Sequence, residues 1–517
     1  MPLLMIVAVL GLALLTQGRA AAPPGLYVAP NGSDASSCTS ANPCASFNRA
    51  YQLAQSGQTV WVAAGTYPDQ SISPSSRSGA GSVVFRPIDG ASVSTGEVRL
   101  NGASGLEFRE MAMTDYYVAG GSSRITFRDI AAQFFFIRSA TAVSIIGGSV
   151  GGEDEAISPT IGATYQSTVP SRDILVDGVT FHDITRAKAP ADHLECLFVQ
   201  SVDGLTVRNS RFHNCNIFDV YVNNIGIGPV PANLTFEDNF FDVATDGGYY
   251  SLYVRSDPGD VLANIALIHN SFAQGFHFDS GTYDGTSVVA NVSPLGSCTV
   301  GISYSYNVFD RTTCGPTDKQ APLGFVNQAG FDLHLVRGAA ALGLDKSHAG
   351  PVRDIDGDLR PLRAATDAGA DQRETALIVP GRSIGAVRIG MPEAQVAAAY
   401  GPPRSVRATA YSRGAPRVTV ATYRAHSGQL SIVYDGAVVV GVSTTSPYYT
   451  TAAGHGVGVP FAPTNGTWLA CLGVYRQIVG GVTTDFATQG AQKFGRVVRA
   501  SLLRRGYRDP GCQGAVR

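Results

Sequence analysis

Side chains that can bind charged groups or transfer protons recur at fixed positions in four short stretches of this 517-residue sequence. The stretches are LFVQS (197–201), VYVNN (220–224), LYVRS (252–256) and FHFDS (276–280), and each begins apolar, variable, apolar, polar. The variable positions hold Phe198, Tyr221, Tyr253 and His277, and the polar positions hold Gln200, Asn223, Arg255 and Asp279. Phenol and imidazole groups serve as general acids and bases, and an Arg guanidinium pairs with carboxylates. The spacing therefore predicts one polar surface built by repetition.

Strand alternation decides which of these side chains face outward. If the apolar positions face a core, the variable and polar positions point to the other side. Stacked copies would then form an aromatic column, a polar column, and a third outward column of Cys196, Asp219, Ser251 and Gly275. Such a face suits a sugar chain, because pyranose faces pack on aromatic rings and carboxylates pair with Arg255. The alternative is that loops cover this face and the aromatic side chains belong to the core.

His193 and Glu195 lie just before the first stretch, in ADHLECLFVQ. They could form an acid/base pair at the edge of the face. Glu195 also shares its strand parity with Phe218 and Tyr250, which are expected to face inward. In that case Glu195 is a buried carboxylate that needs a partner or a raised pKa. The sequence leaves both readings open.

One chemistry that suits the face is β-elimination from a uronate sugar. It requires neutralisation of the carboxylate, removal of the C5 proton and assistance to the leaving oxygen. Arg255, or a Ca²⁺ ion held by Asp219 with Asn223 or Asp279, could neutralise the carboxylate. His277 or Tyr253 could remove the proton. No residue pattern specifies a metal.

Glycoside hydrolysis is the other chemistry, and it needs two carboxyl groups that straddle the bond. Asp219 and Asp279 lie two repeats apart, about 10 Å if the repeats stack as strands, near the upper limit for an inverting enzyme. The acidic turn GGEDEA, with Glu153, Asp154 and Glu155, could supply a partner or a cation site. A solvated acidic loop is the alternative.

A second repeated frame indicates the elements that position these residues. Its copies are ILVDGVTF, LTVRNSRF, LTFEDNFF, IALIHNSF and ISYSYNVF, which begin at residues 174, 205, 234, 265 and 302. Each alternates apolar and polar residues and then meets Asn, Gly or Asp, as a strand followed by a turn does. Two short strands in each period, without crossover helices, bury their apolar faces by coiling into a right-handed parallel β-helix. We expect Asn239, Asn270 and Asn307 to form a side-chain ladder at the turns.

Two segments carry a family resemblance. LYVAPNGSDASSCTSANPCASFNRAYQLAQSGQTVWVAAGTY (26–67) resembles the opening of secreted right-handed parallel β-helix proteins of the pectate-lyase-like superfamily, with a capping helix at 47–54. The segment 331–372 is similar to the way many members end, and its DIDGD (354–358) is expected to be a turn. The resemblance implies the fold but no activity, because the superfamily includes lyases, hydrolases, epimerases and non-catalytic proteins. The Arg, Lys and Asp patterns of its well-known enzymes are not found here.

The sequence changes character after residue 380. Residues 380–517 hold 15 Lys and Arg against 4 Asp and Glu, a net charge of +11, which leaves −13 for the rest. A strand, a short helix from Pro392 and a Gly-Pro stop are expected in 385–403, and a hairpin at Asp435-Gly436. These features resemble the α+β module of β-lactamase-inhibitor-like and outer-membrane-lipoprotein-like domains. We therefore predict a signal peptide at 1–22, a β-helix at 26–373, a linker at 374–383 and a small α+β domain at 384–517.

The expected compartment is outside the cytoplasm. The apolar run at 3–15 is too short to span a bilayer and suits a cleaved secretory signal. Export favours disulfides, and pairing between sequence neighbours gives Cys38–Cys44, Cys196–Cys215, Cys298–Cys314 and Cys471–Cys512. Asn31, Asn233, Asn291 and Asn465 match the glycosylation acceptor pattern. We expect a secreted monomer without a membrane span whose partner is a polysaccharide and not nucleic acid: a polysaccharide lyase, an inverting hydrolase, or a non-catalytic glycan-binding or adhesion protein.

Overall fold

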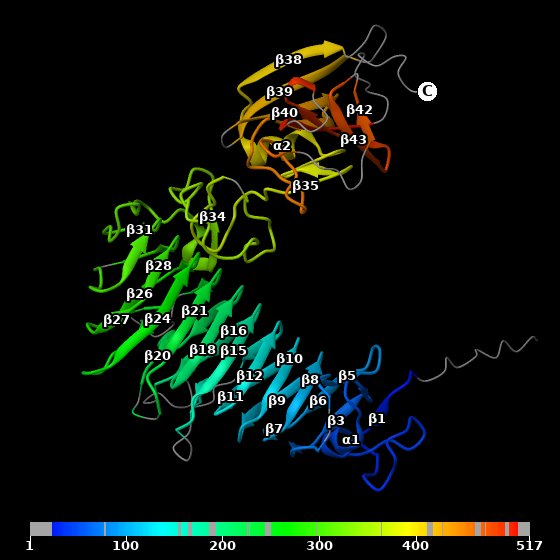
Figure 1. Ribbon diagram of the computed structural model, residues 1–517, viewed down its shortest axis with the longest axis vertical. Helices are drawn as coiled ribbons and strands as arrows, with labels where there is room; N and C mark the ends of the chain where they lie inside the picture. The colour runs from blue at the N-terminus through cyan, green and yellow to red at the C-terminus, as the bar shows by residue number, and fades with distance from the viewer. Residues whose placement is uncertain are drawn as a thin grey trace, which may run out of the picture.

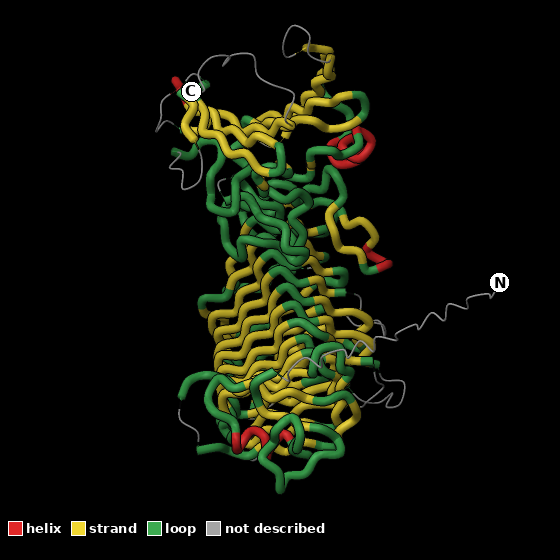
Figure 2. Tube along the Cα trace, turned by 90° about the vertical axis from the view of Figure 1, so that its right-hand side faces the viewer, coloured by secondary structure: helices red, strands yellow, loops and turns green. Residues whose placement is uncertain are grey.

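The computed structural model shows a long stack of parallel coils followed by a smaller antiparallel sheet (Figures 1 and 2). It describes residues 23–504 apart from 77–78, 153–156, 164–167, 186–192, 225, 227, 243–249, 296, 363, 411–416, 426–427, 461–466, 471 and 492–495. The predicted signal peptide and the acidic turn with Glu153, Asp154 and Glu155 lie outside the described residues. The predicted parallel β-helix is confirmed.

The described coils place their strands in three parallel stacks. The first stack contains β1 (Leu26–Val28), β2 (Thr59–Val62), β5 (Val83–Pro87), β8 (Ser104–Arg109), β10 (Ser123–Arg128), β12 (Thr141–Ile146), β15 (Ser171–Asp177), β18 (Val202–Arg208), β21 (Ala232–Glu237), β24 (Val261–Ile268), β27 (Thr282–Asp284), β28 (Ser287–Val289) and β30 (Ser303–Ser305). Its strands pair in parallel register; Leu205, for example, lies opposite Leu234, and Leu234 opposite Ile265.

The second stack contains β3 (Gly65–Tyr67), β6 (Val93–Thr95), β13 (Ser149–Gly151), β16 (Thr180–Ile184), β19 (Arg211–Cys215), β22 (Phe240–Phe241), β25 (Ser271–Phe272), β29 (Val292–Ser293), β31 (Val308–Phe309) and β32 (Lys319–Gln320). The third contains β4 (Gln70–Ile72), β7 (Val98–Asn101), β14 (Thr160–Gly162), β17 (Glu195–Val199), β20 (Phe218–Val222), β23 (Leu252–Val254) and β26 (Phe276–Phe278). The long strands β9 (Ala112–Ala119) and β11 (Ala131–Arg138) belong to both stacks.

Each full coil therefore has three strands and not the two read from the sequence. The difference arises at the second frame, because ILVDGVTF holds the end of β15, a turn at Gly178 and the start of β16. Gly178 has a φ of +70°, a backbone conformation that glycine adopts readily. The sequence reading merged these two short strands into one element.

The interior of the coils is a continuous apolar core. Inward Phe181, Phe212, Phe241 and Phe272 stack on one another with ring centroids 4.7–4.9 Å apart. This spacing matches the distance between neighbouring strands, so each coil lays its ring on the one before it. The repeated Phe of the second frame thus serves the core.

An asparagine ladder runs along the coils inside the turns. The side-chain oxygens of Asn270, Asn291 and Asn307 each accept from the backbone N–H of the preceding ladder residue at 2.8–3.1 Å, starting at Asn239. The predicted ladder is confirmed, and Asn291 extends it. Asn291 has no exposed surface, so the expectation of a glycosylation acceptor there is wrong for the folded chain.

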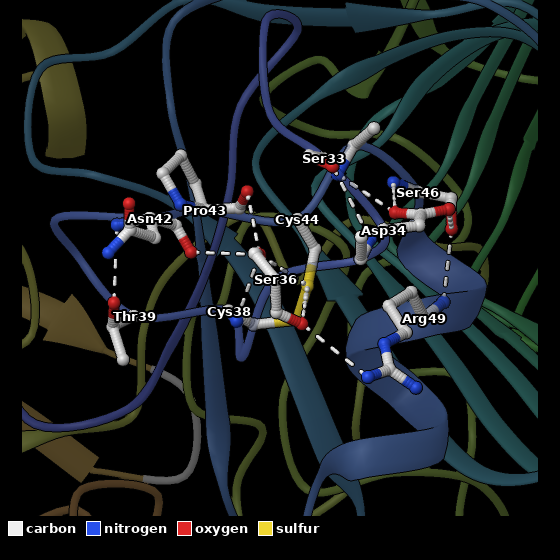
Figure 3. Close-up of a disulfide and its surroundings, with 12 residues drawn as sticks. Ser33, Asp34, Ser36, Cys38, Thr39, Asn42, Pro43, Cys44, Ser46 and Arg49 are labelled. Carbon is white, nitrogen blue, oxygen red and sulfur yellow. Dashed lines mark hydrogen bonds between the residues drawn. A yellow bond between two sulfur atoms is a disulfide. The ribbon is translucent and has the colours of Figure 1, made fainter.

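The helix α1 (Phe47–Leu53) caps the first coil, as expected. Ser46 accepts from the Arg49 N–H at 3.1 Å, and Asp34 binds the Ser46 hydroxyl at 2.6 Å (Figure 3). Phe47 stacks on Phe85 at 5.1 Å, which covers the open end of the core. The Cys38–Cys44 disulfide closes the loop beside it (Figure 3).

Three of the predicted disulfides are confirmed: Cys38–Cys44, Cys196–Cys215 and Cys298–Cys314. Cys471 and Cys512, expected to form the fourth, lie outside the described residues. Over the described part of the chain, no helix combines the length and the apolar character that crossing a membrane requires.

The closing segment covers the last coils through buried polar contacts. It begins with an antiparallel hairpin of β33 (Phe325–Asn327) and β34 (Asp332–Leu335), joined by the short helix η1 (Gln328–Gly330). Arg360 donates to Asp238 at 2.6 Å, and both side chains are buried. His269 and Asp345 are also fully buried, 3.0 Å apart. Burial lowers the pKa of His269 to about 4, so at neutral pH this contact is a hydrogen bond from a neutral imidazole.

The second domain is an antiparallel sheet with one described α-helix. The small strands β35 (Ile378–Val379), β36 (Ser383–Ile384) and β37 (Val387–Arg388) precede α2 (Glu393–Tyr400). The sheet has the order β38 (Ser405–Ala410), β39 (Arg417–Ala425), β40 (Gly428–Asp435), β41 (Val438–Thr444), β45 (Val497–Arg504), β44 (Val482–Thr488), β43 (Val474–Val479) and β42 (Thr467–Leu469), and the short helix η2 (Gln489–Ala491) precedes β45.

Two local expectations for this domain are confirmed, and the linker is revised. Pro392 is the N-cap of α2, and β40 and β41 form the hairpin at Asp435-Gly436. The stretch predicted as a linker contains β35, and Ile378 is buried in the core of the second domain. Residues 374–383 therefore pack as part of that domain.

Candidate functional site

The four repeated stretches do stack in register on the third stack, in the strands β17, β20, β23 and β26. Phe198 lies opposite Tyr221, Tyr221 opposite Tyr253, and Tyr253 opposite His277. Leu197, Val220, Leu252 and Phe276 occupy the alternate positions and are buried. The predicted column is thus a single row on the outer face of the third stack.

The rings of this column stack on one another, so their faces do not point outward. The centroid distances are 5.6 Å for Phe198–Tyr221 and 5.5 Å for Tyr221–Tyr253, with interplanar angles of 25° and 22°. Neighbouring rings therefore cover one another's faces, and the column presents edges and phenolic hydroxyls. The expectation that sugar rings pack on these aromatic faces needs correction, because the faces are already in contact with rings.

Exposure along the column is uneven. Phe198, Tyr253 and His277 are partly exposed, whereas Tyr221 keeps only 9% of its surface. The imidazole of His193 lies 5.4 Å from the Tyr221 ring and contributes to its cover. The column is neither a bare surface nor a closed core.

The polar column adds a charged group beside the rings. Arg255 is exposed, and its Nε and Nη2 donate to Asp257 at 3.2 and 3.1 Å. Asn223 donates to the Tyr221 hydroxyl at 2.9 Å. Burial raises the pKa of Tyr221, and the nearby Arg255 opposes the rise. Tyr221 is therefore a protonated phenol near a cation at neutral pH.

Asp279 holds two members of the column. Its Oδ1 accepts from the Tyr253 hydroxyl at 2.8 Å and lies 3.3 Å from His277 Nε2. Burial and this carboxylate raise the pKa of Tyr253. A neutral His277 that donates from Nε2 to Asp279 carries its lone pair on Nδ1. The arrangement is that of a base oriented by a carboxylate.

The other two members of the polar column are not displayed. Gln200 and Asn223 keep 4% and 5% of their surface. The expectation that they contact a ligand directly is corrected for Gln200, whose amide Nε2 donates to the Ala163 carbonyl at 3.4 Å. Asn223 instead donates a hydrogen bond to the Tyr221 hydroxyl.

Asp219 has the predicted column position but is completely buried. Neither oxygen has a hydrogen bond of normal geometry to a described residue, although the Ser251 side chain and the Asp242 backbone act to lower the pKa of Asp219. Burial, and then the neighbouring Asp242, raises its pKa well above the usual range. The expectation that Asp219 faces a ligand is therefore wrong.

The position of Asp219 also excludes two arrangements predicted from the sequence: a Ca²⁺ site shared with Asn223 or Asp279, and a catalytic carboxyl pair with Asp279. Asp219 and Asn223 lie four residues apart in one extended segment, about 13 Å, and no single Ca²⁺ ion spans that distance. Asp279 is in the Asn223 row and two coils further on, so Asp219 and Asp279 are about 16 Å apart. That separation exceeds the range of an inverting carboxylate pair.

His193 and Glu195 form the predicted pair, in contact through Nδ1 and Oε1. Glu195 is buried, opposite Phe218, and accepts from the Ser158 hydroxyl at 3.1 Å. His193 is half exposed and contacts the rings of Phe218 and Tyr221. Both readings thus hold: Glu195 is a buried carboxylate, and its partner lies at the edge of the column.

The column continues toward the N-terminus, which the sequence reading missed. Thr160 lies opposite Phe198, Phe136 opposite Thr160, Tyr117 opposite Phe136, and Arg99 opposite Tyr117. The guanidiniums of Arg99 and Arg138 lie over the rings of Tyr117 and Phe136, at 4.7 and 4.4 Å. The stretches YYVA (116–119) and FFIR (135–138) share the apolar, variable, apolar frame and could have revealed this.

The DIDGD segment is the turn that the sequence predicted. Asp354 Oδ1 accepts from the N–H groups of Asp356 and Asp358, and its Oδ2 accepts from the Gln372 N–H. Asp356 binds Arg211 and His334. The carboxylates of Asp354 and Asp356, which lie near Asp371, therefore already bind donor groups of the protein itself.

Comparisons with known proteins give only distant likenesses. No protein-family model matches the chain, and no curated protein matches it. A rhamnogalacturonan lyase is 14% identical with a TM-score of 0.34, over 59% of this chain and 91% of its own. The complex of XylC with xylose gives 9% and 0.39, over 68% and 98%.

An endo-xylogalacturonan hydrolase from Aspergillus tubingensis is 14% identical with a TM-score of 0.23, over 58% of this chain and 99% of its own. All three TM-scores lie below 0.5. The strand pairing described above therefore carries the fold assignment by itself: an all-β parallel β-helix followed by a smaller antiparallel β domain.

Proposed function

We propose that the outer face of the third stack binds a uronate-containing polysaccharide and cleaves it by β-elimination. The observation that carries the proposal is the contiguous placement of Tyr221, Tyr253 and His277 in one row with Arg255 beside them. A cation, a phenolic acid and a carboxylate-oriented imidazole are the three groups that this reaction requires.

Each residue has a role in the proposed reaction that follows from its position on this face. Arg255 lies in the middle coil and pairs with the sugar carboxylate through the N–H groups that Asp257 leaves free. His277, one coil further, takes the C5 proton on Nδ1. The C5–H electrons form the C4–C5 double bond, the C4–O bond breaks, and Tyr221 donates its phenolic proton to the leaving oxygen. No water is consumed, and the raised pKa of Tyr221 keeps that proton in place before the reaction.

The test is a panel of polysaccharides with matched variants. Purified protein is incubated with polygalacturonate, alginate, hyaluronan and neutral xylan, with and without a chelator. Ultraviolet absorbance of the conjugated uronate reports elimination, and reducing-end release reports any cleavage. We expect absorbance with one acidic polymer, and the chelator arm reports whether cleavage depends on a divalent cation.

His277→Ala should lower kcat on the order of 100-fold while the polymer still binds. Arg255→Ala should weaken binding and turnover together, because it removes the carboxylate partner. Arg86→Ala is the matched control, an outward arginine of β5 paired with Asp89 on the first stack. Equal losses in all three variants, or reducing ends without absorbance, would contradict the elimination mechanism.

A second candidate is a glycan-binding protein without catalysis. It is favoured by the cover over Tyr221 and by the engagement of both Tyr253 and His277 with Asp279. Retained binding without new reducing ends from any polymer would select it. Under either function we propose that the protein acts outside the cell, which the three disulfides support.

A further inference from the structure

A row of hydroxyl side chains crosses the sheet of the second domain. The pairing of neighbouring strands places Ser405 opposite Thr422, Thr422 opposite Ser431, Ser431 opposite Ser443, and Ser443 opposite Ser501. Directly paired residues of antiparallel strands point to the same face. These five side chains, named here the hydroxyl row, therefore lie on one face at the strand spacing of about 4.8 Å.

The hydroxyl row lies on the face opposite the domain core. The alternate positions, including Ala421, Ile432, Val442 and Leu502, are buried in that core. Every member of the row is at least partly exposed. The row continues into Asp485 and Arg476, which bind each other at 2.5–2.7 Å. A sheet face with so regular a line of donors and acceptors matches a ligand that is itself extended and repetitive.

Three more arginines give this face its charge. Arg424 and Arg499 lie two residues from Thr422 and Ser501, on the same side of the row, and Arg407 lies on its other side. All three are exposed. Of the four arginines on this face, only Arg476 forms an ion pair with a described residue. Arg407, Arg424 and Arg499 therefore give this face a positive charge that no ion pair among the described residues offsets.

We propose that the hydroxyl row and its flanking arginines form a second binding site, for an extended anionic polysaccharide. Serine and threonine hydroxyls bind sugar hydroxyls, and the arginines pair with carboxylate or sulfate groups. This site does not depend on the β-helix face, because it lies in another domain with its own core. It gives the +11 charge of residues 380–517 a ligand of opposite charge.

The test uses the full chain carrying Tyr221→Ala and Arg255→Ala, which weaken the β-helix face. Polygalacturonate represents carboxylates, dextran sulfate represents sulfates, neutral dextran is the uncharged control, and duplex DNA is the non-glycan polyanion. Affinity is measured by calorimetry at two salt concentrations. We expect binding of at least one anionic glycan, weaker at high salt because exposed charges are screened.

The decisive variant is Arg407→Gln/Arg424→Gln/Arg499→Gln, expected to bind about tenfold more weakly. Its matched control is Arg382→Gln/Arg388→Gln/Arg417→Gln, which loses the same charge from exposed arginines outside this face and should bind as the parent does. Ser431→Ala/Ser443→Ala/Ser501→Ala keeps the charge and should weaken binding several-fold. Circular dichroism confirms that each variant folds.

The proposal is overturned if both arginine triples weaken binding equally, since net charge alone then explains it. It is also overturned if the first triple and the serine triple bind as the parent does. Tighter binding of DNA than of either anionic glycan would assign the face to nucleic acid instead.

Discussion

The proposed reaction depends on Asp279, because its carboxylate contacts both Tyr253 and His277. One oxygen accepts the Tyr253 phenol at 2.8 Å and lies 3.3 Å from His277 Nε2. In the proposed mechanism His277 Nε2 donates to this oxygen, which leaves Nδ1 to accept a proton. Arg255 has its own carboxylate, Asp257, so the two acidic groups do not compete for one cation.

Asp279→Asn tests this role. An amide can still hold the Tyr253 hydroxyl but does not stabilise the imidazolium, so we expect kcat to fall about tenfold or more with little change in KM. The measurement is initial rate against substrate concentration. Asp257→Asn is the matched carboxylate change beside Arg255 and should alter KM instead. A change confined to KM in Asp279→Asn would contradict the orienting role.

His334 gives a stability prediction with a definite sign. It lies between Asp332 and Asp356, and these partners, Asp356 first, raise its pKa from 6.5 to about 9. A raised pKa adds stability that is fully present below pH 6.5 and is lost as the pH rises through 9. His334→Gln should therefore lower the Tm at pH 6 and have little effect at pH 10. The loss should be modest, because the side chain is 37% exposed.

The Tm is measured by scanning calorimetry at both pH values. His348→Asn, a change at an exposed histidine, is the control and should show no pH-dependent difference. A Tm loss in His334→Gln that is equal at pH 6 and pH 10 would show that the contribution is packing and not charge.

Among the elements, the strand registers were the part most open to prediction. Alternation within LFVQS, VYVNN, LYVRS and FHFDS correctly placed the row from Phe198 to His277, because a buried side of each strand leaves only one register. Strand alternation could not predict which of the outward-pointing side chains are buried. Asp219 and Gln200 have outward parity and are buried, because tertiary contacts between coils and loops decide exposure after the strand pattern is set. The sequence pattern likewise did not predict that the rings of the column stack on one another, because stacking depends on the side-chain orientations in neighbouring coils.

The asparagine ladder can be tested at Asn270. Its side chain accepts from Asn239 and donates to Asn291 and the Phe236 carbonyl, with no exposed surface. Asn270→Ala leaves several buried groups unpaired, so we expect a loss of about 3 kcal/mol in the free energy of unfolding. Urea titration measures it. The exposed change Asn42→Ala should cost less than about 0.5 kcal/mol, and a similarly small loss at Asn270 would contradict the ladder's role.

The N-terminal continuation of the column predicts length-dependent binding. Arg138 shares its row with Arg255, four coils away, about 19 Å. Arg138→Ala should weaken binding of long oligouronates about fivefold and leave short ones unchanged, because only the long ones reach both arginines. Calorimetry with a length series measures this. An equal loss for all lengths would place Arg138 outside the binding face.

At the scale of the whole molecule, the chain joins two domains of opposite charge through a tight junction. Gln372 donates to the Tyr448 hydroxyl at 2.8 Å, and the Glu374 carboxylate accepts from Tyr449 at 2.5 Å and from Tyr400. The tyrosines involved are largely buried in the second domain. The sequence analysis predicted a linker at 374–383, because a short run of mixed residues does not indicate the partners that it contacts in the fold. The junction holds the second domain at the closing end of the coils (Figure 1).

The most direct test of the central claim is a crystal structure of His277→Ala with an oligouronate from the polymer that it binds. We expect the sugar chain to run along the coils over β17, β20, β23 and β26, with a carboxylate on Arg255 and a glycosidic oxygen near the Tyr221 hydroxyl. A sugar chain seated on another stack, or none on this face at saturating concentration, would contradict the account.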